Sequence, residues 1–375
     1  MRGSVKNLSK NKWKLIYDRK PKMVNGELKR VQGTKVFNGT KSEAEAKLAE
    51  LIAEANSGVS SKNKNMTVKE LLEFWYEATK NTVSYRTKCS YDETIKLHLV
   101  PNFGAYKLID LEPPKIQTYI NDMDGKLSST TIAYHYRVLK MALLFAVGQG
   151  LIRSNPCDGV RPPTKNEYGG ILLTQSQVKY VLDNAKGTIM YIPIALAAFL
   201  GLRRGEICAL TWDNIDLENN VARIAHSLSR EDGKLKVVKT KTKRIRYVAI
   251  GPELSKILTD YLKTQKTWND AAGIERKFVC CWEDGRPLDP HYVSKRYREI
   301  LTTLKLDSKS RFHDLRHNFV TNLLESGVNP KIISEMVGHT IPEHILLATT
   351  FQTYSHVDVE MQRGAAQYIE DSYLN

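Results

Sequence analysis

Long apolar runs are missing from this chain of 375 residues. The most apolar stretch, residues 190–202, contains a proline and a glycine, and it is shorter than the roughly 20 residues that span a bilayer. The first residues also lack the apolar core of a signal peptide. We therefore expect no membrane association. The apolar stretch itself is predicted to be a buried core helix.

Paired cysteines are missing as well. The five cysteines are odd in number and show no CxxC spacing, which argues against a zinc site and against a secreted disulfide framework. The sequence also offers no convincing cluster of carboxylates for Mg²⁺. We therefore expect an enzyme or binding protein that uses no metal and no cofactor.

Acidic residues are scarce relative to basic ones. Lysine and arginine total 56 against 41 for aspartate and glutamate, which gives a net charge of +15 and a pI near 9.4. An excess of this size points to a polyanionic partner, most simply nucleic acid. The alternative is a basic protein whose lysines are merely solvated.

The basic excess is concentrated at the start of the chain. Residues 1–41 hold twelve basic residues against two acidic ones. Short strands are predicted at 13–17 and 35–37, with an Asn25-Gly26 hairpin turn between them. We predict that residues 1–60 form a small sheet-plus-helix DNA-binding domain, followed by a polar linker. The residues expected to bind DNA there are Lys12, Lys14, Arg19 and Lys20.

A helix is predicted at the end of this first domain. Ser42 and Glu45 have the spacing of a capping box, in which each side chain bonds to the backbone of the other residue, and an apolar stripe follows them.

Residues 66–160 are predicted to form an all-helical domain. Thr67 and Glu70 repeat the capping-box spacing, and a second apolar helix over 131–147 is expected to end at Gly148. Basic and aromatic residues alternate in two places, which is typical of surfaces that contact phosphates. The aromatic side chains could equally belong to the core. The basic residues concerned are Arg86, Lys88 and Arg137.

A linker rich in proline and glycine precedes residues 170–375, which are predicted to form a mixed, mainly helical domain. Thr174 is expected to cap its first helix. Three strands at 221–225, 235–238 and 245–250 are predicted to form a small antiparallel meander. Helices are expected at 253–267, 290–304, 313–326 and 330–337. The fold class is therefore multidomain α+β.

Four short patterns in the last domain carry chemistry. They are GLRRGE at 201–206, HDLRH at 313–317, VGH at 337–339 and TYSH at 353–356, with a lysine-rich segment at 239–244. Each has a plain structural reading. Arg203 could simply pair with Glu206, one helical turn away. His313 and His317 have zinc-helix spacing, but Asp314 replaces the required glutamate and Arg316 would repel a cation.

Taken together and in this order, the patterns closely resemble those of the tyrosine recombinases, the phage integrase family. The resemblance covers essentially the whole chain and implies an arm-type DNA-binding domain, a core-binding domain and a catalytic domain. It also implies that Tyr354 is the nucleophile and that Glu206 supports the first arginine. The rest of the implied catalytic set is Arg203, Lys241, His313, Arg316 and His339, with Lys239 as the alternative lysine.

The chemistry explains why these residue types are needed. Two arginines can neutralise the charge that builds on a phosphodiester in the transition state, which replaces a metal ion. Tyrosine must lose its proton to attack, and His313 is the natural base. A lysine can protonate the departing 5′ oxygen. The expected product is a 3′-phosphotyrosyl link, whose retained bond energy makes rejoining independent of ATP.

The sequence departs from the family in one respect. His339 and Tyr354 are fifteen residues apart, whereas the family spacing is shorter by about five. The tail over 358–375 is expected to form a helix that packs on a neighbouring protomer.

The expected partners are double-stranded DNA with core-type and arm-type attachment sites, three further copies of the chain in a tetramer, and a directionality factor or a host DNA-bending protein. We expect the integrase of a phage or mobile element, and the resemblance implies a location in the bacterial cytoplasm, at the nucleoid. The alternatives are a chromosome-dimer-resolving recombinase, a type IB topoisomerase and a DNA-binding regulator with an inactive catalytic fold.

Overall fold

A computed structural model of the chain describes residues 2–24, 27–57, 65–162, 171–240, 244–338 and 357–374. The chain divides into two compact units, Met1–Glu167 and Tyr168–Asn375. The buried apolar side chains of the first unit form two separate clusters, one within residues 15–51 and one within residues 68–160. The division of the chain into three domains stays a prediction.

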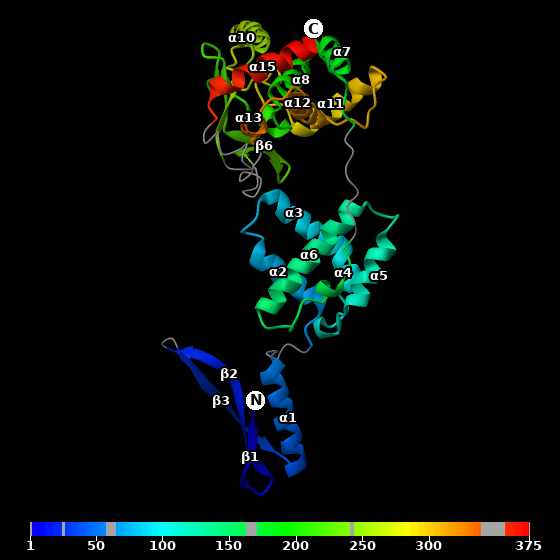
Figure 1. Ribbon diagram of the computed structural model, residues 1–375, viewed down its shortest axis with the longest axis vertical. Coiled ribbons are helices and arrows are strands. Elements are labelled where there is room, and N and C mark those ends of the chain that lie inside the picture. The colour runs from blue at the N-terminus through cyan, green and yellow to red at the C-terminus, as the bar shows by residue number, and fades with distance from the viewer. Residues whose placement is uncertain are drawn as a thin grey trace. The chain divides into compact units, whose positions relative to one another are not determined.

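The N-terminal part is a three-stranded antiparallel sheet with one helix beside it (Figure 1). The strands lie in the order β1-β2-β3, and the helix α1 contacts β1 and β2. Leu15 and Tyr17 point to the same side of β2 and are buried with Leu48 and Leu51 of α1. The element bounds are β1 Gly3–Ser9, β2 Lys12–Val24, β3 Glu27–Asn38 and α1 Lys41–Ser57.

Two sequence predictions for this part have different outcomes. Val24 pairs with Glu27, so β2 and β3 form the predicted hairpin, although Asn25 and Gly26 themselves lie outside the described residues. The predicted cap at Ser42 is wrong. The backbone N–H of Thr40 donates to Glu43 at 2.7 Å, so the capping box sits two residues earlier, where β3 has ended and the chain turns.

The second part of the first unit is helical, as predicted. The capping box of Thr67 and Glu70 is present at the start of α2, and α6 ends at Gly148. A short π-helical segment, Ile95–Leu99, connects α3 to α4. The helix bounds are α2 Val68–Thr79, α3 Tyr85–Thr94, α4 Val100–Phe103, α5 Pro113–Met123 and α6 Ser129–Gly148.

The second unit is mainly helical and is built around α8, whose residues after Tyr191 are all buried. This confirms the core helix predicted from the apolar stretch. Thr174 forms a capping box with Gln177 at the start of α7, also as predicted. The helix bounds are α7 Gln175–Ala185, α8 Tyr191–Leu200, α9 Arg204–Ala209, α10 Pro252–Ala272, α11 Pro290–Thr303, α12 Asp314–Glu325, α13 Pro330–Val337 and α15 Val359–Leu374.

The predicted three-stranded meander is wrong. One sheet has the order β4-β5-β8, and β6 and β7 form a separate hairpin between β5 and β8 in the sequence. Of the residues of β6 and β7, Leu228 alone is buried. The hairpin therefore has little buried apolar surface with which to join the core sheet. The bounds are β4 Ile215–Asp216, β5 Val221–Ile224, β6 His226–Glu231, β7 Lys234–Lys239 and β8 Arg246–Ala249.

The C-terminal helix α15 packs on its own domain, which corrects the prediction that it packs on a neighbouring protomer. Ala365, Ile369 and Tyr373 are buried in the same cluster as α8. The helix contacts α7, α10 and β8 (Figure 1). In the described parts of the chain, no helix combines the length and the apolar character that a membrane crossing requires.

Candidate active site

Arg203 lies between α8 and α9, at a point where the chain must turn sharply. Gly201 ends α8 with a positive φ of 59°, and Arg203 is the extended residue that precedes α9. Its Nη1 donates to Glu206 at 2.9 Å, and its backbone N–H donates to the other carboxylate oxygen at 2.9 Å. The pairing expected from the i, i+3 spacing is therefore present, and it fixes the direction of the guanidinium.

Glu206 is a buried carboxylate held by two arginines. Besides Arg203, it accepts hydrogen bonds from Nη1 and Nη2 of Arg246 at 3.1 and 2.7 Å. Burial alone would raise the pKa of Glu206, but the bonds and charge of Arg246, followed by those of Arg203, outweigh it and lower the pKa below its ordinary value. The carboxylate is therefore ionised at neutral pH and neutralises one of the two cations.

Arg316 comes from α12 and is almost completely buried, with 2% of its surface exposed. Its Nη1 donates to the carbonyl oxygen of Gly201 at 2.7 Å, and its Nη2 donates to the carbonyl oxygen of Val337. Burial first, and then repulsion from Arg203, lowers the pKa of Arg316 to about 9, which leaves it protonated at neutral pH. It carries a positive charge without a carboxylate bonded to it in the described residues.

The three arginines meet at the end of α13. Arg246 donates from Nε to Met336 at 2.8 Å, Arg316 donates to Val337, and Arg203 donates from Nη2 to Gly338 at 3.0 Å. These are the carbonyl oxygens of three consecutive residues where the helix has no further N–H to pair them. The negative end of the helix dipole therefore holds three guanidinium groups together. Three such cations face one carboxylate, so the cluster has positive charge to spare for an anion.

His313 is the residue before α12 and lies beside these cations. Its ring stands edge-on to that of His317, with centroids 5.1 Å apart. His313 is exposed to solvent but partly enclosed by its neighbours. This partial burial first, and then repulsion from His317 and Arg316, lowers the pKa of His313 to about 4. The imidazole is therefore neutral at pH 7 and can accept a proton.

The other predicted catalytic residues have different outcomes. Lys241, His339 and Tyr354 lie outside the described residues. Lys239, the alternative lysine, is the exposed last residue of β7, opposite His226 of β6. The structure thus brings together Arg203, Glu206, His313 and Arg316 from motifs more than one hundred residues apart.

Arg246 is the residue of this cluster that sequence reasoning did not assign. It stands on the inward face of β8 together with Val248, while Tyr247 between them is exposed. Side chains of a strand alternate between its two faces, so a charged residue on the buried face of a short strand needs a buried partner of opposite charge. That alternation is the signal by which Arg246 could have been found.

Five of the predicted DNA-binding residues are exposed or half-buried in the first unit, and their role in binding DNA stays a prediction. Lys12 and Lys14 alternate along β2 with the side chains that face α1. Arg137 of α6 lies over the ring of Tyr134, 4.9 Å from its centroid, and Tyr134 is itself partly buried against the core. The aromatic ring of Tyr134 thus belongs in part to the core, and the contact of this surface with phosphates stays a prediction. Arg86 is exposed and Lys88 is half-buried on α3, and the side chains of Arg19 and Lys20 lie outside the described part.

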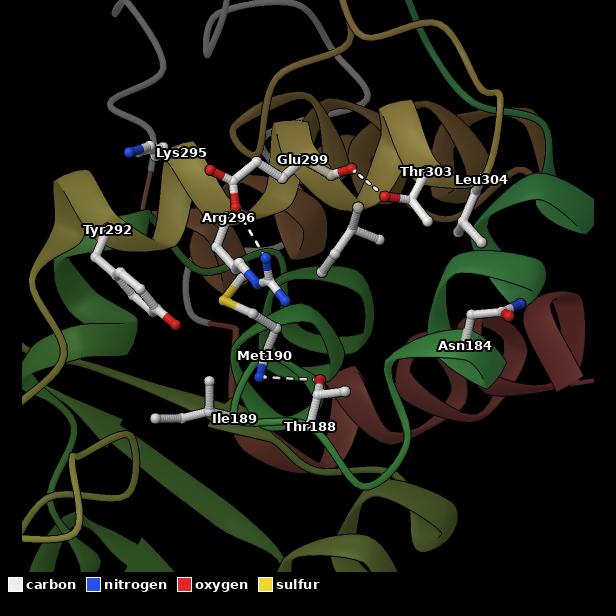
Figure 2. A pocket seen from close by; sticks show the side chains of 11 residues that line it. Asn184, Thr188, Ile189, Met190, Tyr292, Lys295, Arg296, Glu299, Thr303 and Leu304 are labelled. Carbon is white, nitrogen blue, oxygen red and sulfur yellow. Dashed lines mark hydrogen bonds and ion pairs between the residues drawn. The ribbon is translucent and has the colours of Figure 1, made fainter.

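A pocket of about 530 Å³ lies away from this cluster, between α11 and the segment before α8 (Figure 2). Arg296 in its wall pairs with Glu299 at 2.9 Å, and the hydroxyl of Thr303 donates to the backbone carbonyl of Glu299 at 3.0 Å. Several of its polar groups therefore bind one another. Among the described residues, no group of histidine, cysteine and carboxylate side chains could hold a metal ion.

Comparison with known proteins identifies the family. The sequence model of the "Phage integrase family" matches residues 172–361, just over half of the chain. The model of "Phage integrase, N-terminal SAM-like domain" matches residues 67–123. The chain therefore belongs to the phage integrase family, the tyrosine recombinases, which cut and rejoin DNA at specific sites. The family and the mixed helical fold predicted from the sequence are confirmed.

Relatives agree with this assignment over most of the chain. A "Tyrosine recombinase XerC-like" protein of Caldanaerobacter subterraneus subsp. tengcongensis is 28% identical, over 93% of this chain and 94% of its own length. An "Integrase" of Streptomyces ambofaciens is 27% identical, over 80% of each chain. The fold resembles that of the Tn1549 transposon integrase in complex with a circular intermediate DNA, with a TM-score of 0.67, 23% identity and coverage of 80% of this chain and 98% of that one.

Proposed function

We propose that this chain is the integrase of a phage or other mobile element, and that it cleaves DNA through a 3′-phosphotyrosyl link to Tyr354. The observation that carries the proposal is the cluster of Arg203, Arg246 and Arg316 around the single carboxylate of Glu206. Such a cluster can accept one phosphodiester and has no need of a metal ion.

In the proposed reaction, the hydroxyl oxygen of Tyr354 attacks the scissile phosphorus. A bond forms between that oxygen and phosphorus, and the bond from phosphorus to the 5′ oxygen breaks. His313 accepts the tyrosine proton, and the hairpin lysine, Lys241 or alternatively Lys239, gives a proton to the 5′ oxygen. His339 hydrogen-bonds the phosphate. Reversal of the same steps rejoins the strands.

Arg203 and Arg316 would bind the non-bridging oxygens. Each terminal nitrogen of a guanidinium carries two hydrogens, so the bonds to Glu206 and to the backbone still leave donors for an anion. Arg203 is the more open of the two, with 22% of its side chain exposed. A phosphate placed among these cations also offsets the repulsion that lowers the pKa of His313, which makes that imidazole a stronger base when DNA is bound.

The proposal extends to the domains and partners. Residues 1–60 would bind arm-type sites, residues 66–160 and 170–375 would bind and cut core-type sites, and four copies would act together on DNA in the bacterial cytoplasm. A directionality factor or a host DNA-bending protein would assist. The basic sheet of residues 3–38 favours an integrase over a chromosome-dimer resolvase, because resolvases usually lack such a domain.

A suicide substrate tests the proposal. The probe is a nicked duplex that carries the core site found at the ends of the element bearing the gene, and the readout is a covalent protein–DNA band. The wild type should form the band and Tyr354→Phe should not, whereas Tyr368→Phe, a control on the exposed side of α15, should retain it. Absence of a band with the wild type would favour the inactive regulator, and a band with Tyr354→Phe would refute the choice of nucleophile.

A further inference from the structure

Arg246 uses all three of its nitrogens inside the protein. Nη1 and Nη2 bind the two oxygens of Glu206, and Nε binds the carbonyl oxygen of Met336. Only 7% of the residue is exposed. Arg316 is buried as well, but its bonds go to carbonyl oxygens, whereas the carboxylate of Glu206 already neutralises Arg246 through both of its Nη atoms. The role of Arg246 must therefore be exerted through the groups that it holds.

The first of those groups is Glu206, the partner of Arg203. A carboxylate with one arginine can rotate about its own bond, but a forked pair fixes both of its oxygens. The oxygens that accept from Arg246 are the same two that accept from Nη1 and the backbone N–H of Arg203. The position of Arg203 is therefore set by Arg246, which lies 43 residues further along the chain.

The second group is the end of α13. Gly338 has a positive φ of 65°, and a Cβ on it would lie 3.1 Å from Cδ and Nη1 of Arg246. The guanidinium thus fills the space left by the missing side chain. Because the carbonyl oxygen of Gly338 accepts from Nη2 of Arg203, the contact of Arg246 with this turn again acts on Arg203.

We infer that Arg246 is a positioning residue for DNA cleavage, which fixes Glu206 and the end of α13 and through both orients Arg203 toward the scissile phosphate. The inference rests on the proposed function. Arg246 belongs to β8, the strand that follows the lysine-rich segment. Through Arg246 and Glu206, this strand is connected by hydrogen bonds to Arg203.

The variants that test this are Arg246→Met and Arg246→Lys. The matched control is Arg223→Met on the neighbouring strand β5, where Arg223 bonds to Asn214 at 2.9 Å and makes no hydrogen bond or ion pair with the cluster. Cleavage of the nicked core-site duplex should fall by about 10–100-fold in Arg246→Met, the range for groups that orient a functional ligand. Arg246→Lys should retain part of the activity, Arg223→Met should cleave normally, and DNA binding should be unchanged in all three.

A second substrate separates positioning from folding. In a duplex with a methylphosphonate at the scissile position, one anionic oxygen is replaced by a methyl group, so less charge has to be neutralised. If Arg246 acts through Arg203, the defects of Arg246→Met and Arg203→Ala should both shrink on this duplex. An equal loss on the two substrates, or no loss on either, would overturn the inference.

A double variant keeps the test decisive if Arg246→Met folds poorly. Glu206→Gln with Arg246→Met removes both buried charges, and its loss of cleavage should be clearly smaller than the product of the two single losses, because only the contact with the end of α13 remains to be lost. Losses that multiply would mean that the two residues act independently and would overturn the inference. A wild type without a Tyr354-dependent band refutes the proposed function, whereas a normal band in Arg246→Met refutes only the role of Arg246.

Discussion

Nη1 of Arg316 donates a hydrogen bond to the carbonyl oxygen of Gly201 at 2.7 Å. Gly201 ends α8 in the left-handed conformation, and a Cβ there would lie 2.6 Å from Cδ1 of the buried Phe319. Phe319 and Arg316 belong to the same helix, α12. The placement of Arg316 in the candidate active site therefore depends on Gly201, a position that only glycine fits.

Gly201→Ala should lower both stability and cleavage. Left-handed backbone and overpacking each cost about 1–3 kcal/mol, and the clash pushes α12 away from the carbonyl that binds Arg316. Gly187→Ala is the control, because Gly187 also has a positive φ but a Cβ there meets nothing within 4 Å. Thermal unfolding and covalent-complex yield should separate the two variants. Equal effects would mean that backbone strain alone matters.

Sequence reasoning located the residues whose partners are close in the sequence. Arg203 and Glu206 stand three residues apart and pair as helical geometry predicts, and the family motif points to His313 and Arg316 together. Arg246 was not assigned because its partner Glu206 comes from another element. The carbonyl oxygens at the end of α13 also carry no signature, since every residue has one.

The elements show the same limit. Thr40–Glu43 and Ser42–Glu45 fit the capping-box pattern equally well, and the choice depends on where β3 ends. The hairpin of β6 and β7 was merged with the sheet because strand pairing is a long-range property that local alternation cannot specify.

His135 gives the helical part of the first unit a predictable response to pH. It is buried, its Nδ1 lies 2.8 Å from the hydroxyl of Tyr119, and its ring stacks on that of His98 with centroids 4.2 Å apart. Burial first, and then the charge of His98, lowers the pKa of His135 from 6.5 to about 4. The unfolded chain therefore binds a proton more readily than the folded one between those two values.

Stability should consequently fall as the pH drops from about 6.5 toward 4. Each pKa unit corresponds to about 1.4 kcal/mol, so the loss at pH 5 should be about 2 kcal/mol. Hydrogen exchange of α5 and α6 peptides in the full chain at pH 7.5 and 5 would measure it, after correction for the intrinsic exchange rates. His135→Gln keeps an acceptor for Tyr119 and should flatten the response. An unchanged response in that variant would assign the effect to another group.

Removal of residues 1–60 should leave core-site cleavage intact and abolish integration. Lys12 and Lys14 alternate on β2 with residues of a small separate core, so this part can bind phosphates without touching the arginine cluster. A plot of the logarithm of the DNA-association constant against the logarithm of the salt concentration should become less steep by about 0.9 for every phosphate that the shortened protein no longer binds. Binding to arm-site duplexes at several salt concentrations would check this. Normal integration by the truncated protein would refute an arm-binding role.

The C-terminal helix α15 is fastened by a buried carboxylate. Glu370 accepts hydrogen bonds from the backbone N–H groups of Glu253 and Leu254 at 3.0 and 2.9 Å, and so caps the start of α10. Burial raises the pKa of Glu370 above its ordinary value. Ionisation of Glu370 therefore lowers the stability of the folded protein, and this loss grows as the pH rises from the pKa of the unfolded chain to the higher pKa of the folded one. A neutral side chain with an acceptor oxygen can replace the carboxylate.

Glu370→Ala should release α15, whereas Glu370→Gln, which keeps an acceptor oxygen without the charge, should hold it. Loss of a cap of this kind costs about 0.5–2 kcal/mol. Tyr354 lies five residues before α15 in the sequence, so a released helix should also lower the yield of covalent complex. Glu360→Ala on the exposed side of the same helix is the control. Limited proteolysis would report release directly, and equal protection of α15 in Glu370→Ala and the wild type would show that the carboxylate does not fasten it.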